Sequence, residues 1–224
     1  MKAPARRAHG LLLAIVIAAR LALPAGPCDA ATDSRLAARL DPETAAQVGE
    51  LVEQARERGL PSEALVARAL EGATRQALGP RIVTAVRNLL GALERAQEAM
   101  GNESTPAELV AGAAALSAGV APDTLASLRR TRRPGSLVVP LVVLADLVSR
   151  RVPVETASAT VLAATRAGVR DPELMKLRQR IGQDIRGGAS PANATILRTR
   201  SLVRGFEGPP VDPGAPGHPR GTRP

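Results

Sequence analysis

Apolar residues recur along this chain at spacings of three and four, as in Leu70 and Ala73, with polar residues between them. Residues at these spacings lie on one face of an α-helix. No long stretch alternates between apolar and polar positions, which is the pattern of a half-buried strand. The pattern therefore predicts an all-α protein.

Prolines divide the chain into units of similar length. Proline has no backbone N–H and a preset φ, so it fits the first position of a helix. Four of the eight intervals between successive prolines of the central region are 19 residues long. These prolines are Pro42, Pro61, Pro80, Pro106, Pro122, Pro140, Pro153, Pro172 and Pro191. They predict about eight or nine short antiparallel helices, with a longer one over 80–100 and a shorter one over 140–152.

Residues near the prolines fit helix boundaries. Thr105 and Glu108 flank Pro106 in the order of a capping box, and Asp41, Asp171 and Ser190 precede their prolines as N-caps. Glycines shortly before the next helix start predict left-handed helix ends. These glycines are Gly59, Gly79, Gly101, Gly119, Gly168 and Gly188.

The predicted core contains no aromatic residues. The chain has no Trp, no Tyr and a single Phe, Phe206, near its C-terminus, so Leu, Val, Ile and Ala must fill the interior. The most apolar stretch after the N-terminus begins at Leu137 and continues through Val148. It is too short for a membrane span, and we expect a central buried helix.

Two 19-residue units make a helical hairpin of about 38 residues, a spacing that resembles α-solenoids of the HEAT or TPR type. The resemblance is to this class alone, because the aromatic positions of TPR units are absent. It implies stacked helical hairpins. The irregular spacing over 80–153 leaves a compact multi-helix bundle as the alternative.

Both ends differ in composition from the centre. Residues 1–30 have the form of a signal peptide, with Lys2, Arg6 and Arg7 before an apolar segment and a cleavage point predicted near Ala30. A retained N-terminal anchor is the alternative. Residues 205–224 contain six prolines and five glycines, which predicts a disordered tail. The expected organisation is a signal peptide (1–30), a helical repeat-like domain (34–204) and a tail (205–224).

Cleavage would change both the cysteine content and the net charge. Cys28 is the only cysteine, so the mature chain would form no disulfide. Lipid attachment at Cys28 is disfavoured by the preceding Pro27. The net charge is +9 for the whole chain, and 26 basic and 20 acidic residues, or +6, remain after residue 30. We expect an exported protein, periplasmic or extracellular, whose mature chain has no transmembrane span.

Catalytic side chains are scarce. The two histidines, His9 and His218, lie outside the predicted domain, which excludes histidine-based triads and common zinc sites there. No phosphate-binding glycine loop is present. We therefore predict no catalytic residue, cofactor or metal, and no enzymatic activity.

Asp146, inside the apolar stretch, is the one candidate general acid. The favoured interpretation is an ion pair with Arg150, four residues on, and the pairs Glu71–Arg75 and Arg180–Asp184 have the same spacing. A carboxylate-dependent cell-wall enzyme is the alternative, although the domain has no aromatic residue on which a sugar ring would stack.

The densest basic cluster is the candidate binding site, a weak one, for a polyanion or an acidic partner. Its residues are Arg129, Arg130, Arg132 and Arg133. Arginines bind phosphate and carboxylate groups, but here they also lie at a predicted helix end, where they complement the helix dipole. Nucleic acid is a weaker partner, because export and the lack of aromatic residues both argue against it.

Three functions follow from these features. The first is an exported helical binding or scaffolding protein whose partner is another protein. The second is an envelope-associated protein that binds anionic lipid or polymer through the arginine cluster. The third is the cell-wall enzyme. The sequence predicts neither the partner's identity nor the oligomeric state.

Overall fold

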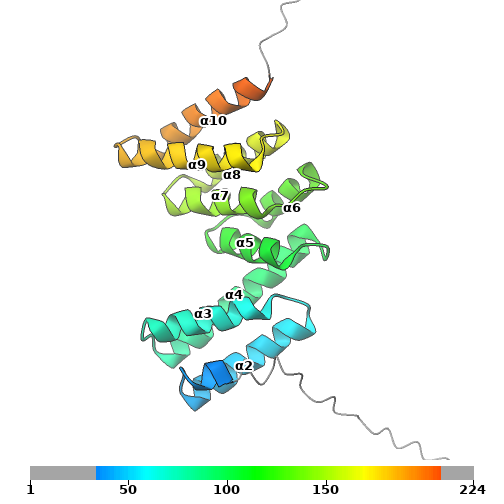
Figure 1. Cartoon of the computed structure of the whole chain (residues 1–224), viewed down its shortest axis with the longest axis vertical. Helices are drawn as coiled ribbons and strands as arrows, with labels where there is room; N and C mark the ends of the chain where they lie inside the picture. Colours follow the sequence, from blue (N-terminus) through cyan, green and yellow to red (C-terminus); the bar gives the residue numbers. More distant parts are fainter. Residues whose placement is uncertain (1–33, 208–224) are drawn as a thin grey trace, which may run out of the picture.

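The computed structural model describes residues 34–207, and these residues form helices and short connections with no strand, which confirms the all-α prediction (Figure 1). A helical turn at 34–37 precedes the first long helix. The long helices are α2 (Pro42–Glu57), α3 (Ser62–Thr74), α4 (Gly79–Met100), α5 (Pro106–Ser117), α6 (Pro122–Thr131), α7 (Val138–Ser149), α8 (Val154–Arg166), α9 (Asp171–Arg186) and α10 (Pro191–Glu207).

Eight of the nine prolines lie at or next to a helix start, as predicted, whereas Pro140 lies inside the first turn of α7, which spans Val138–Ser149 rather than the predicted 140–152. Helices α2, α5, α6 and α10 begin at their proline, and Pro80 and Pro172 are the second residue of theirs. Pro61 and Pro153 are N-caps, and Pro140 is the third residue of α7. The first four N–H groups of a helix have no intrahelical acceptor, so a proline at any of these positions removes no helix hydrogen bond.

The caps and helix ends agree with the predictions in most places. Asp41 accepts a hydrogen bond from the Thr44 amide (2.9 Å). Asp171 is not an N-cap but the first residue of α9, and the prediction for it was wrong. Five of the six glycines have a positive φ. The prediction for Gly79 was also wrong, because this residue begins α4 and Gln76 (φ 54°) takes the left-handed position after α3.

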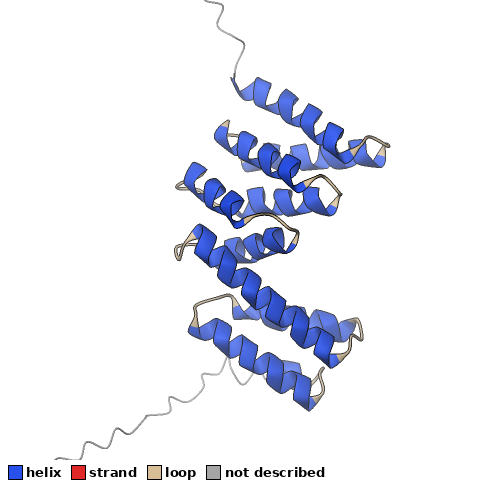
Figure 2. Ribbon diagram, turned by 180° about the vertical axis from the view of Figure 1, so that it is seen from behind, coloured by secondary structure: helices blue, strands red, loops and turns tan. Residues whose placement is uncertain are grey.

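The helices lie in two rows along the long axis of the molecule. In one row α2 packs against α4, α4 against α6, α6 against α8 and α8 against α10; in the other α5 packs against α7 and α7 against α9. The rows meet where α4 packs against α5, α7 against α8 and α9 against α10, and α3 packs against α2 and α4. Figures 1 and 2 show the rows from opposite sides, with α5, α7 and α9 nearer the viewer in Figure 1.

Helix α7 is the central buried helix that its apolar sequence predicts. Leu141, Leu144 and Leu147 are fully buried, and α7 packs against α5, α8 and α9. Among the helices of 34–207, none is both long enough and apolar enough to cross a lipid bilayer.

The predicted signal peptide and most of the predicted tail lie outside the described residues. At the C-terminal boundary, α10 continues past Arg204 to Glu207, so the helical region ends slightly later than predicted.

Two glycine-to-alanine substitutions should have opposite effects on stability. A methyl group at Gly79 would overlap Thr44 Oγ1 and lie 3.3 Å from Asp41 Oδ2, at the cap of α2. We expect Gly79→Ala to lower the free energy of unfolding by about 1–3 kcal/mol, the usual cost of overpacking. The measurement is urea denaturation followed by circular dichroism.

Gly49→Ala is the matched control. Gly49 lies inside α2 with no atom within 4 Å of an added Cβ, so the substitution should raise the free energy of unfolding by up to about 1 kcal/mol through helix propensity. Equal effects of the two substitutions would contradict the close packing of α4 on α2.

Candidate functional site

The structure separates the four arginines of the predicted binding cluster into two kinds. Arg129, in the last turn of α6, forms an ion pair with Glu108 of α5 (Nη2–Oε1 2.9 Å). Arg132, the C-cap of α6, forms an ion pair with Asp171 at the start of α9. Arg130 is exposed and donates a hydrogen bond to Ser127 Oγ (3.0 Å), and Arg133 is exposed. The cluster therefore presents two guanidinium groups to solvent rather than four.

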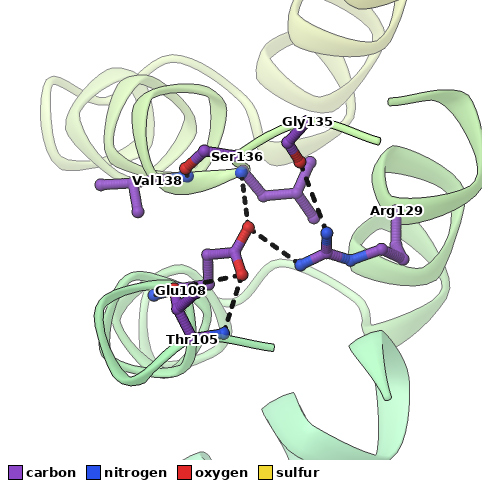
Figure 3. Close-up of polar contacts among 7 residues, drawn as sticks. Thr105, Glu108, Arg129, Gly135, Ser136 and Val138 are labelled. Atoms are coloured by element: carbon purple, nitrogen blue, oxygen red, sulfur yellow. Dashed lines mark hydrogen bonds and ion pairs between the residues drawn. The ribbon is translucent and has the colours of Figure 1, made fainter. Parts of the chain in front are cut away.

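Glu108 is the residue that brings this region together (Figure 3). Only 3% of the surface of Glu108 is exposed to solvent. Its Oε2 accepts hydrogen bonds from the Thr105 amide (2.9 Å) and the Thr105 hydroxyl (3.2 Å). The Glu108 amide donates in return to the Thr105 hydroxyl (3.3 Å), so the predicted capping box is present. Its Oε1 accepts a hydrogen bond from the Leu137 amide at the start of α7 (2.8 Å) and also meets Arg129. One carboxylate thus contacts groups at the ends of three helices.

Arg129 continues this network into the connection between α6 and α7. Its Nη1 donates to the carbonyl oxygen of Gly135 (3.4 Å). The guanidinium is largely buried, with 16% of its side chain exposed. Because a buried ion needs both an opposite charge and hydrogen-bond partners, Glu108 and the Gly135 carbonyl together account for its position.

The surroundings lower the pKa of Glu108. Desolvation is the largest single effect and raises the pKa, since burial disfavours the charged form. The hydrogen bonds from the Leu137 and Thr105 amides, together with the hydrogen bond and charge of Arg129, outweigh desolvation. The net result is a pKa below the ordinary value of 4.5, so Glu108 is ionised at neutral pH.

A surface groove of about 800 Å³ opens beside this pair. The α4–α5 connection forms one wall, including Asn102 and Glu103, and the α6–α7 connection with Arg133 and Ser136 forms the other. Its polar groups carry both signs of charge, which favours neither anions nor cations as ligands.

Asp146 forms the predicted pair with Arg150. The Arg150 Nε lies 2.7 Å from Asp146 Oδ2, and Nη2 lies 3.2 Å from Oδ1. The predicted pair of Glu71 with Arg75 is present as well (2.7 Å). Asp184 does not pair with Arg180; it pairs with Arg198 of α10 (2.6 and 2.8 Å). Asp184 thus pairs with an arginine of another helix rather than with the predicted arginine of its own helix.

Sequence reasoning missed a row of exposed apolar side chains on one face of the molecule. Val110, Val142 and Met175 are 39%, 38% and 37% exposed. Each is the fifth residue of its helix, in α5, α7 and α9, and these three helices lie side by side in one row. Glu108 of α5 accepts a hydrogen bond from the Leu137 amide at the start of α7, and Asp171 at the start of α9 pairs with Arg132 at the end of α6. The three exposed side chains share the fifth position of their helices, and we call them the apolar row.

No group of three or more His, Cys, Asp or Glu side chains within residues 34–207 is arranged to hold a metal ion. The comparisons with known proteins give no further guide: no family model, no curated protein and no solved structure matches this chain.

Glu108→Gln should destabilise the fold. The substitution removes the charge that neutralises Arg129 and places an amide where an acceptor is needed. We expect the free energy of unfolding to fall by roughly 2–3 kcal/mol, less than for a completely buried pair because Arg129 keeps some contact with water. Glu103→Gln, an exposed carboxylate in the same groove, is the control and should change stability by less than about 0.5 kcal/mol. Equal effects in urea denaturation would show that the Glu108 pair is unimportant.

The contribution of Glu108 should also depend on pH. Its pKa is lower in the folded than in the unfolded state, so its ionisation stabilises the fold fully above the unfolded-state pKa. That stability is lost as pH falls from about 4.5 through the lower folded-state pKa. The stability difference between wild type and Glu108→Gln should therefore shrink as the pH is lowered over this range. The other carboxylates with lowered pKa values, Asp41 and Asp184, are common to both proteins and cancel. A difference independent of pH would contradict the pKa direction.

Proposed function

We propose that this protein is an exported, non-catalytic binding or scaffolding protein, and that its helices form a solenoid-like stack of hairpins with another protein bound along the α5–α7–α9 face. The apolar row carries this proposal. Export rests on the signal-peptide features of residues 1–30, which lie outside the described residues.

The packing of the helices supports a stack rather than a compact bundle. Every extensive contact is between helices one or two places apart along the chain. In a globular bundle, elements distant in sequence also pack together. Neighbour-only packing is the property of solenoid proteins, whose elongated faces bind partner proteins.

The character of the α5–α7–α9 face supports a protein partner. The outward positions of α5 carry no charge: Ala107, Ala114 and Ser117 are exposed alongside Val110. Exposed apolar side chains gathered over several helices are typical of interaction surfaces, whereas singly scattered ones need no explanation. The apolar row spans three helices, so its natural ligand is an extended segment that crosses them.

The alternative functions receive less support from the geometry. The envelope-binding hypothesis depended on four arginines, and two of these, Arg129 and Arg132, already have carboxylate partners. The enzyme hypothesis depended on Asp146, which both ends of the Arg150 guanidinium fork hold in an ion pair. Both oxygens of the Asp146 carboxylate are thus engaged by Arg150 rather than presented to a substrate.

Site-specific photo-cross-linking in the producing cell tests the proposal. A photoreactive residue at Val142 should give a discrete adduct with another protein, and Val110→Glu in the same chain should abolish it, because a charge would be desolvated in the interface. The matched control places the photoreactive residue at Leu197, which is 63% exposed on α10 in the other row, and should give no such adduct.

Two results would overturn this proposal. One is the absence of an adduct at Val142; the other is the same adduct from Val142 and Leu197. Circular dichroism of Val110→Glu establishes that the substitution leaves the helices intact, so that a lost adduct reports on binding.

A further inference from the structure

A second pocket lies between the end of α7 and residues 175–186 of α9, and Met175 of the apolar row is among its lining residues. We call it the α7–α9 pocket; its volume is about 250 Å³. Four of its lining residues are cationic: Arg150, Lys176, Arg178 and Arg186. No carboxylate lines it. This is a different set of arginines from the cluster singled out in the sequence.

Arg150 is held in a fixed orientation at the pocket. Asp146 engages its Nε and Nη2 atoms, which leaves Nη1 directed over α9. A Cβ atom added at Gly182 would lie 3.0 Å from Arg150 Nη1. The planar guanidinium is therefore anchored on one edge and presents the other edge to the pocket.

Gly182 allows a second guanidinium to approach the same place. The added Cβ would lie 3.6 Å from Arg186 Nη1, so both Nη1 atoms converge on the space that a side chain at position 182 would occupy. Glycine inside a helix costs about 1 kcal/mol relative to alanine. The two guanidinium groups fill the space that this costly residue leaves.

The converging cations lack anionic partners. Among residues 34–205, Lys176, Arg178 and Arg186 form no hydrogen bond or ion pair, and the Asp146 carboxylate is the one acid that touches the group, through Arg150. Like charges gathered without partners repel each other. A bound anion would remove this repulsion.

The charge of the whole C-terminal half favours anions as well. Residues 34–121 contain 9 basic and 11 acidic side chains, whereas residues 122–205 contain 15 basic and 6 acidic ones. The corresponding net charges are −2 and +9. A surface of one sign raises the local concentration of oppositely charged ligands.

We propose that the α7–α9 pocket is a binding site for a doubly charged phosphate group. Arginine guanidinium groups present pairs of N–H donors that match two oxygens of a phosphate. Arg150 and Arg186 would hold the oxygens from the floor over Gly182, and Lys176, Arg178 and the Gln179 amide would close the sides. The phosphate group belongs either to a soluble molecule or to a lipid headgroup. This proposal does not rest on the proposed function, although Met175 belongs both to the pocket lining and to the apolar row.

Isothermal titration calorimetry of the full chain with pyrophosphate, at constant ionic strength, tests the site. We expect saturable binding of one pyrophosphate per chain, and at least about tenfold weaker binding in Arg186→Gln, the effect of losing one charged hydrogen bond. The matched control is Arg200→Gln, which removes the same charge from an exposed position on α10 and should change affinity less than about twofold, because a distant charge is screened.

Gly182→Ala adds a test that does not change the charge. Its methyl group would lie 3.0 Å from Arg150 Nη1 and push that guanidinium aside, so pyrophosphate affinity should fall, while thermal unfolding shows the protein still folded. Vesicle sedimentation then identifies the source of the phosphate. Binding to phosphatidic acid vesicles that is lost in Arg186→Gln assigns the site to lipid headgroups; no vesicle binding, together with pyrophosphate binding, assigns it to soluble phosphates.

The proposal is overturned if pyrophosphate and phosphatidic acid vesicles both fail to bind. It is also overturned if Arg186→Gln and Arg200→Gln weaken binding equally, since attraction by net charge alone would then suffice.

Discussion

The buried carboxylate of Glu108 is the interaction on which the middle of the structure depends. Helices α5 and α6 follow each other in the chain, but neither α5 with α6 nor α6 with α7 forms an extensive packing contact. Glu108 supplies what packing does not: it caps α5, accepts the Leu137 amide at the start of α7 and pairs with Arg129 near the end of α6. The cost of burying this charge is offset by four donors, a condition that few alternative arrangements of these helices would satisfy. The α6–α7 connection takes its course from these bonds.

The absence of aromatic residues from the interior of residues 34–205 determines how closely the helices around Glu108 pack. Each Leu, Val, Ile or Ala side chain fills a smaller volume of the interior than an aromatic ring would. Helices approach closely where small residues meet. At Gly112 of α5, an added Cβ would lie 2.7 Å from the Met100 methyl and 3.2 Å from Ala96 Cβ, so side chains of α4 pack directly against the α5 backbone there. Close approach compensates for the modest area that each side chain buries.

The helices could be predicted from local sequence features, whereas the contacts between side chains distant in sequence could not. Proline and capping residues act within one turn, so the starts of α2 and α5 follow from Asp41 and from the Thr105–Glu108 box. Gln76 and Arg151 adopt the left-handed conformation that ends α3 and α7, where the amides of Ala77 and Val152 donate to Gly72 and Leu147. Glycine is the usual residue in this conformation, so its absence at these two positions hid the helix ends in the sequence. The same limit applies to Glu108: the capping motif identifies one of its roles, but its Arg129 contact joins residues 21 positions apart. The apolar row became visible only once α5, α7 and α9 were known to lie side by side.

Packing restricted to near neighbours has a mechanical consequence. No contact ties α2 to α10, so the ends of the molecule are coupled only through the interfaces in between. Small rotations at successive interfaces therefore add along the long axis, and a load or ligand applied across several helices bends the whole array at low cost. Bending of such an array would be distributed over many small changes between helices that themselves stay unchanged.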